Sequence, residues 1–192
     1  LLRARLLHWA APHRAEAIAD AAHAAVLAAG DVAGQIAAAR VRGLVAWRRG
    51  APQLAVQHFQ AGLALGLQHG QPAQRAILLD GLGLAMADLG DADGARAAFS
   101  EALALNDATG NDLQAVQNLI NLSLDARLSA PARAQALAQR ALALCLEIGF
   151  AHYQPHAQVA LSVALSAGGR AEAARAAVDA ALAAARQSGD DY

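Results

Sequence analysis

The chain has 192 residues, of which 56% are hydrophobic, 16% are charged and 4% are aromatic. A chain this apolar is not intrinsically disordered, and a net charge of −1 excludes the basic field typical of nucleic-acid-binding domains. The charge is uneven. Seven Arg against three acidic residues give +4 over residues 1–50, and one Arg against eight acidic residues gives −7 over residues 76–125. This polarity indicates either solvated helix faces or a polarised binding surface.

A single cysteine, Cys145, rules out an internal disulfide framework and a cysteine-based zinc site, and its apolar neighbours favour a buried thiol. The chain begins with Leu and carries no recognisable signal peptide, so we expect a fragment of a larger protein. The uncharged stretches 50–74 and 148–169 contain Pro, Gln and His, which the hydrocarbon core of a membrane would disfavour. We therefore expect no membrane insertion and a cytoplasmic location.

The strongest pattern in the sequence is an internal repeat of 40 residues, with one step of 39 residues whose shortening falls between Leu124 and Ala134. The repeat predicts a single domain of five units, at about 1–33, 34–73, 74–113, 114–152 and 153–192. The 40-residue shift places identical residues on one another: Gly50 on Gly90, Ala55 on Ala95, Phe59 on Phe99, and Leu63 on Leu103.

Each unit divides into two predicted helices, which are clearest at 74–89 and 94–109. In the second of these, apolar residues recur every three or four positions, as they do on one face of a helix. Gly90 and Gly110 suit the left-handed residue that ends a helix, and Asp91 and Asp93 suit the cap of the helix that follows. No stretch alternates with the period of a strand. The sequence therefore predicts an all-α fold of about ten antiparallel helices. Five prolines fall near predicted helix starts: Pro12, Pro52, Pro72, Pro131 and Pro155.

The motif of unit 74–113 resembles the tetratricopeptide repeat (TPR), in its long variety of about 40 residues found in kinesin light chains and many bacterial regulatory proteins. The unit before it matches less fully and the later units match more weakly. The resemblance implies a TPR-like solenoid, which is an α-α superhelix. The residues that carry it in unit 74–113 are Leu79, Leu82, Gly83, Met86, Gly90, Ala95, Phe99 and Ala102.

In such a solenoid the first helices of successive units line a concave groove, which binds a protein or peptide segment. The resemblance therefore implies a set of groove positions in three units. The residue pattern with which some family members grip a C-terminal carboxylate is absent. The groove positions are Arg40, Leu44, Trp47, Ile77, Asp80, Leu84, Gln117, Ile120, Asn121, Leu124 and Arg127.

Two groove positions allow more than one interpretation. Asn121 occupies the place where long-repeat members carry an Asn that hydrogen-bonds a peptide backbone, since an amide can donate and accept. It could equally be an ordinary polar helix residue. Trp47 could anchor a ligand in the groove, or it could fill the core beside a neighbouring helix.

No catalytic pattern is present, and we predict neither enzymatic activity nor a cofactor. His152 and His156 lie four residues apart, but Pro155 separates them and no carboxylate completes a metal site. Asp88, Asp91 and Asp93 lack the spacing and the final Glu of a calcium loop. We therefore expect no metal site.

Three hypotheses for function follow from the sequence. The first is a scaffold that binds a protein segment or peptide in its groove, inside a larger bacterial signalling or transcription-regulatory protein. The second is a self-association module that forms a homodimer, because the apolar sides of helix 170–187 and of the leading segment can pack against a second copy. The third is a small-molecule sensor with an enclosed pocket near Trp47 and Leu84.

Overall fold

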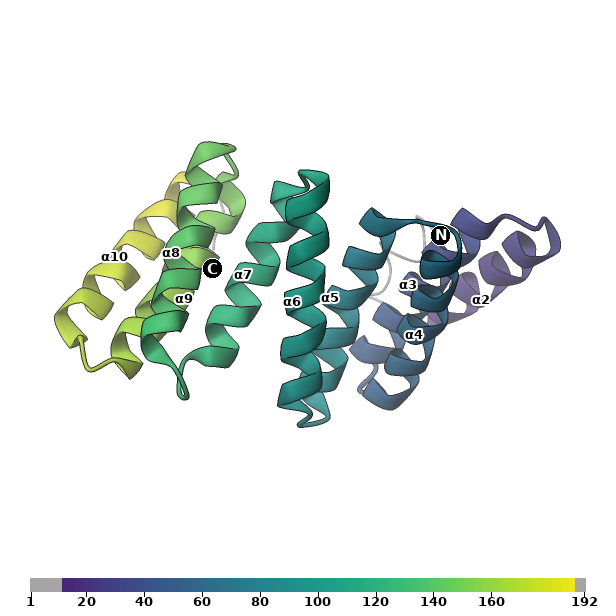
Figure 1. Ribbon diagram of the computed structural model, residues 1–192, viewed down its shortest axis with the longest axis horizontal. Coiled ribbons are helices and arrows are strands. Elements are labelled where there is room, and N and C mark those ends of the chain that lie inside the picture. The colour runs from purple at the N-terminus through teal and green to yellow at the C-terminus, as the bar shows by residue number, and fades with distance from the viewer. Residues whose placement is uncertain (1–11, 189–192) are drawn as a thin grey trace. The chain divides into compact units, whose positions relative to one another are not determined.

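A computed structural model describes residues 12–188, and the leading segment 1–11 lies outside the described residues. The described part of the chain holds nine α-helices, one short 3₁₀-helix (η1) and no strand (Figure 1). The predicted all-α fold is confirmed, with nine α-helices between residues 12 and 188 where about ten were expected for the whole chain. In chain order the elements are α2 (Pro12–Ala28), α3 (Val32–Arg48), α4 (Pro52–Gln68), α5 (Pro72–Asp88), α6 (Ala92–Thr109), α7 (Asp112–Ala126), α8 (Pro131–Glu147), η1 (Ala151–Tyr153), α9 (Gln154–Ala167) and α10 (Ala171–Ser188).

Local sequence signals set the helix starts. A proline is the first residue of α2, α4, α5 and α8 and the second residue of α9, where the missing N–H removes no helical hydrogen bond. The two helices predicted at 74–89 and 94–109 each begin two residues earlier, because Pro72 opens α5 and Asp91 caps α6. The Asp91 carboxylate accepts a hydrogen bond from the Gly94 amide at 2.9 Å. Asp93 lies inside the first turn and pairs with Arg96 instead.

The helix ends repeat as regularly as the starts. Seven glycines with φ between 62° and 80° follow helices at intervals of about 20 residues, from Gly30 to Gly169. The turn between α7 and α8, at residues 127–130, has no such glycine, and here the repeat is shorter by one residue. Turn chemistry therefore keeps the helices nearly equal in length and alternating in direction.

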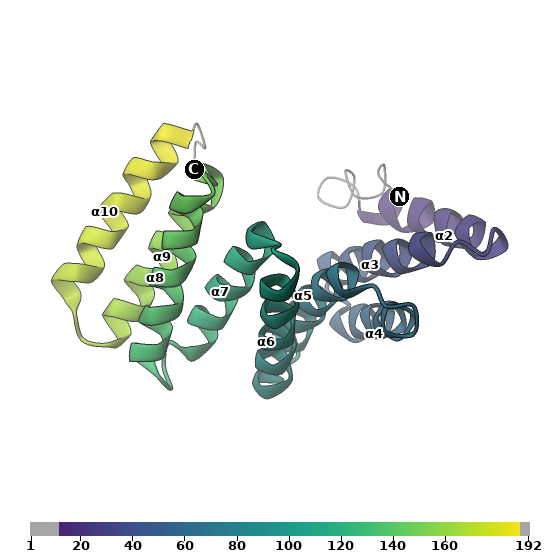
Figure 2. The same ribbon diagram turned by 45° about the horizontal axis from the view of Figure 1, so that its top comes forward.

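Packing follows chain order within each of two compact units, and the chain divides between them after Leu105. In the first unit α2 packs on α3, α3 on α4 and α4 on α5; in the second, α7 packs on α8, α8 on α9 and α9 on α10. First helices of neighbouring repeats also touch, α3 with α5 and α7 with α9. Figures 1 and 2 show these elements as antiparallel hairpins. Contacts between sequence neighbours are what a solenoid of helical hairpins requires.

Close approach of the helices depends on glycine facing phenylalanine. The ring of Phe59 on α4 lies between Gly43 on α3 and Gly81 on α5, and a Cβ atom at either glycine would lie 2.5 Å from the ring. Gly83 makes the same contact with Phe99, at 2.6 Å. The ring thus occupies the space that two side chains would otherwise need, and α3, α4 and α5 share one core around it.

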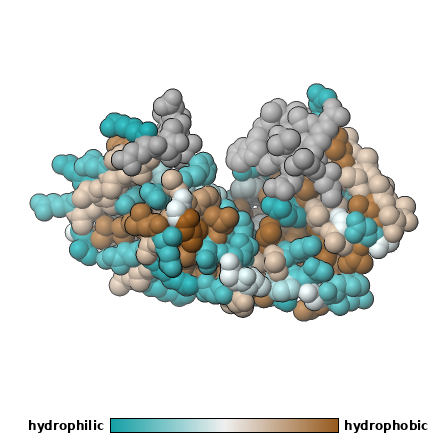
Figure 3. Space-filling model, turned by 90° about the horizontal axis from the view of Figure 1, so that it is seen from above, coloured by the Kyte–Doolittle hydropathy of each residue, from teal (hydrophilic) through white to brown (hydrophobic). Residues whose placement is uncertain are grey.

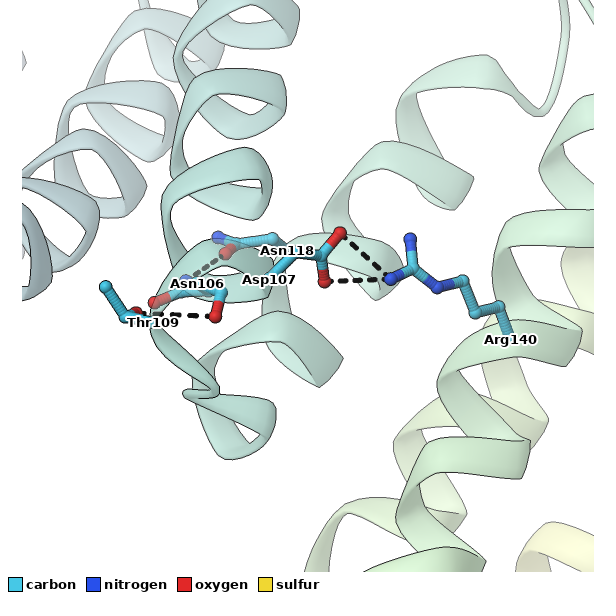
Figure 4. Close-up of polar contacts among 5 residues, drawn as sticks. All are labelled: Asn106, Asp107, Thr109, Asn118 and Arg140. Carbon is cyan, nitrogen blue, oxygen red and sulfur yellow. Dashed lines mark hydrogen bonds and ion pairs between the residues drawn. The ribbon is translucent and has the colours of Figure 1, made fainter.

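A buried polar pair joins α6 to α7, where other repeats have apolar residues (Figure 4). The Asn106 side-chain amide donates to the Asn118 side-chain oxygen at 2.8 Å, and each residue is 1% exposed. Beside it, Arg140 Nη2 donates to both carboxylate oxygens of Asp107, at 2.8 and 2.9 Å, on the exposed surface. The equivalent positions in other repeats are Gly66 with Leu78, and Cys145 with Ala157.

Cys145 lies on α8 with its side chain buried, as its apolar neighbours predicted. Burial raises the pKa of the Cys145 thiol to about 11, because the interior disfavours the thiolate. The thiol therefore packs as a small apolar group. Among residues 12–188, no helix is both long enough and apolar enough to cross a membrane.

Candidate functional site

The groove positions of the first unit lie along α3 and α5, which touch each other. Arg40, Leu44 and Trp47 on α3 are all half-buried, and so are the three positions on α5, namely Ile77, Asp80 and Leu84. Half-burial is what the inner side of a helical hairpin stack produces, since neighbouring helices cover part of each side chain. Each of these side chains is thus partly accessible, and their role in binding a ligand stays a prediction.

Trp47 is held at the ends of both helices. Its indole Nε1–H donates to the Asp88 carboxylate at 2.6 Å, and its ring packs against the core cluster around Phe59. The Arg48 guanidinium lies 4.5 Å from the ring centroid, within the range of a cation–π contact. Trp47 therefore packs against the core, as the core-filling interpretation expects. The role of Trp47 as a groove anchor stays a prediction.

Four of the five groove positions of the second unit lie on α7, and the fifth, Arg127, is the residue that follows the end of this helix. Gln117, Asn121 and Leu124 are half-buried, Ile120 is buried, and Arg127 is exposed. A guanidinium nitrogen of Arg127 donates to the Leu124 carbonyl at the end of the helix. The proposed role of Asn121 in binding a peptide backbone stays a prediction.

An apolar hollow of about 410 Å³ opens in the second unit between α7, α9 and α10. Its volume lies within the range of ligand sites in proteins. Apart from the ring of His156, every lining side chain is apolar, and Figure 3 shows brown, apolar surface among teal, polar surface on the part of the molecule that holds these helices, at the left. The lining residues are Ile120, Leu124, Pro155, His156, Val159, Ala160, Val178, Ala181, Leu182 and Ala185.

Two of the predicted groove positions, Ile120 and Leu124, are thus brought together with residues outside the predicted groove set. His156 and Val159 follow Gln117 and Ile120 by 39 residues, which is one repeat. They therefore occupy the groove positions of the next repeat, 153–192. Carrying the groove positions over to this last repeat would have identified both residues from the sequence. The lining residues on α10 lie on the second helix of their repeat, whereas the predicted groove positions belong to the first helices.

Aromatic rings cluster at the end of the hollow where α9 begins. The rings of His156 and Tyr153 have centroids 5.2 Å apart, and Tyr153 stacks on Phe150 at 4.8 Å. His152 lies 6.0 Å from His156, also measured between ring centroids. In residues 12–188 no group of three or more His, Cys, Asp or Glu side chains is arranged to hold a metal ion.

The hollow also has unusually exposed walls for its composition. Val159, Val178 and Leu182 are 48%, 42% and 50% exposed, and all three face the same space. Contiguous exposed apolar side chains of this kind mark interaction sites, whereas single exposed residues do not. We name this surface, defined by the lining residues above, the apolar hollow.

The first unit also has a polar cleft, where acidic and basic side chains form ion pairs with one another. Arg42 Nε lies 2.7 Å from the Asp20 carboxylate, and Arg49 pairs with Glu16. Burial, and next the positive charge of Arg42, lower the pKa of His58 in this cleft, which favours the neutral ring. Since the opposite charges pair with one another, the cleft presents no excess charge to a ligand.

No protein-family model matches the chain, and no curated protein matches it. Solved structures do. BtubC (BKLC) from P. vanneervenii has a TM-score of 0.83 and 19% sequence identity, over 98% of this chain and 79% of that chain. A Podosopora anserina protein described as a kinesin light chain with nearly identical TPR-like repeats has a TM-score of 0.75 and 15% identity, over 98% and 94%.

A third similar structure is a Signal Transduction ATPase with Numerous Domains (STAND) protein with a tetratricopeptide repeat sensor, from Pyrococcus horikoshii. Its TM-score is 0.74 at 16% identity, over 99% of this chain and 33% of that chain. The chain therefore has a TPR-like fold, and the resemblance seen in its repeat motif is confirmed at the level of the fold.

Proposed function

We propose that the chain is a non-enzymatic scaffold that binds a segment of another protein on the inner faces of its first helices. TPR-like repeats generally serve as protein-interaction scaffolds, which supports the general class. The observation that carries the proposal is the apolar hollow, in which two predicted groove positions meet three exposed branched side chains. Removal of this surface from water on binding would drive the association.

We further propose that this scaffold is the regulatory or interaction module of a larger bacterial signalling or transcription-regulatory protein. The STAND protein of similar fold has its tetratricopeptide repeats as a sensor, which supports an input role for such a repeat array. In this arrangement the captured segment would report to an output domain elsewhere in the protein. The proposal includes a cytoplasmic location.

Selection of peptides from a display library on the immobilised chain tests the binding proposal. We expect enriched peptides to bind the chain and to lose affinity by about tenfold or more when Leu124→Glu places a charge in the apolar hollow. Leu146→Glu is the matched control, since Leu146 is exposed on α8 and does not line the hollow. Affinity is measured by isothermal titration calorimetry, and circular dichroism checks the helix content of both variants.

The proposed function fails if no peptide is enriched, or if Leu124→Glu and Leu146→Glu weaken the selected peptides equally. Equal weakening would mean that binding takes place away from the hollow.

A second candidate function is self-association through α10, favoured by the exposure of Val178 and Leu182 on one side of that helix. A homodimer would bury these side chains and bring two output domains together. Sedimentation velocity over a hundredfold concentration range is expected to show a dimer that Leu182→Glu dissociates. A monomer throughout that range would contradict this candidate.

A further inference from the structure

The second helices α4, α8 and α10, which belong to three repeats, allow a comparison of equivalent positions around the apolar hollow. Phe59 on α4, Ala138 on α8 and Val178 on α10 occupy the same position in the repeat. Phe59 is 1% exposed and Ala138 is 0% exposed, whereas Val178 is 42% exposed. The next turn of these helices gives the same contrast, since Leu63 and Leu142 are half-buried and Leu182 is exposed. Val178 and Leu182 thus occupy repeat positions that other helices keep buried or half-buried, yet on α10 both side chains are exposed.

Both α4 and α8 are covered by the first helix of the following repeat, which lies in the same unit. On α4, a Cβ atom at Gly62 would meet the Leu78 side chain of α5 at 3.0 Å, and Phe59 meets Gly81 of the same helix. On α8 the covering helix is α9, which packs against it along the chain. On α10, residues 12–188 supply no covering helix, and the apolar hollow lies beside it.

The apolar lining of the hollow determines which backbone conformation a bound peptide segment can adopt there. The lining comes from the side chains of three helices, and among them the ring of His156 is the only polar group. An extended peptide laid there would leave its own N–H and C=O groups without partners, which costs free energy at each group. An α-helix satisfies its backbone groups internally and presents only side chains.

We infer that the apolar hollow binds an α-helix of a partner protein, seated as the first helix of a repeat sits on the second helix before it. This inference rests on the proposed function and names the class of partner. The partner helix carries a stripe of small or leucine side chains at three-residue spacing, as Leu78 and Gly81 form on α5 and Ala157 and Ala160 form on α9. Small residues are needed opposite Val178, which fills more space than Ala138 does.

The chain itself supplies a probe of the right chemistry. A capped, fluorescently labelled peptide of residues 151–170 contains α9, whose natural seat on α8 is formed by Ala138, Ala141 and Cys145. The equivalent seat on α10 is formed by Val178, Ala181 and Ala185. We expect saturable one-to-one binding of this peptide to the full chain, with a Kd on the order of 10–100 μM, and a gain of helical circular dichroism on binding.

Two matched controls separate helix docking from general apolar adsorption. A peptide with Leu161→Pro cannot form the helix and is expected to bind at least about tenfold more weakly, although its composition is nearly the same. On the protein side, Leu182→Glu should weaken the intact peptide by about tenfold or more, because a carboxylate would be buried against the partner. Leu146→Glu, on the exposed side of α8, should leave the affinity unchanged.

Equal affinity of the proline-containing peptide, or insensitivity to Leu182→Glu, would overturn the inference, as would the absence of any binding by the helical peptide. Competition by a long-chain fatty acid with no effect of helix formation would assign the hollow to a lipid instead, and would also overturn it. If display yields peptides that require Leu124 but bind without gaining helicity, the proposed function stands and the helix inference fails.

Discussion

Replacing Phe59 with alanine is expected to lower the free energy of unfolding by about 3–5 kcal/mol, the largest single effect that we predict for this chain. Phe59 is 1% exposed, and its ring packs against Gly43 on α3 and Gly81 on α5. Neither glycine has a side chain that could replace the ring. The cavity would therefore lie between Gly43 and Gly81, and neither glycine can fill it. Urea denaturation followed by circular dichroism measures the change.

The glycines provide the control for this prediction. Gly81→Ala alone sets two effects against each other: alanine favours the helix by about 1 kcal/mol, and a Cβ atom 2.5 Å from the Phe59 ring causes overpacking that costs about 1–3 kcal/mol. In the Phe59→Ala background the clash is gone, so Gly81→Ala should become stabilising. If Gly81→Ala has the same sign and size in both backgrounds, the proposed sharing of space between ring and glycine is wrong.

The second large effect concerns the buried amide pair of Figure 4. Asn118→Leu is expected to cost about 1–3 kcal/mol, because the Asn106 amide would be left in the core without its partner. Asn106→Ala combined with Asn118→Leu makes both positions apolar, as the equivalent positions of other repeats are. The double variant should therefore be more stable than the sum of the single changes implies, by about 1–2 kcal/mol.

The exposed ion pair beside the amides is the matched control. Arg140→Ala removes the bond to Asp107 at 2.8 Å but leaves no buried group unpaired, so its cost should stay below about 1 kcal/mol. Thermal unfolding of Asn106→Ala, Asn118→Leu, the double variant and Arg140→Ala gives the comparison. Additive costs at Asn106 and Asn118 would show that the two amides do not stabilise the core as a pair.

The fold could be predicted from the sequence because its determinants are local and repeat. Turn glycines, helix-opening prolines and the spacing of Ala95, Phe99 and Ala102 each act within a few residues. Gly83 and Phe99 both belong to the repeat motif, but their close contact is a finding of the structure and not a prediction from the sequence. The choice between Asp91 and Asp93 as the cap of α6 could not be made, because both stand in the same turn and only geometry separates them.

The candidate site could be predicted only in part. Ile120 and Leu124 line the apolar hollow because the repeat register fixes which side of α7 they occupy. Val178 and Leu182 could not be assigned to a site, since the same positions in α4 and α8 are covered by the next helix. Their exposure depends on what packs beside α10 and not on their own sequence. The bond from Trp47 to Asp88 joins residues 41 positions apart, and no periodic pattern indicates it.

Packing of each helix on its sequence neighbours has a consequence for how the chain is made. Within each unit the contacts between elements join helices that follow one another or lie one hairpin apart. Proteins dominated by such short-range contacts fold quickly. During translation, α2 and α3 can therefore pair as soon as both have left the ribosome, and each later hairpin can add to a template already in place.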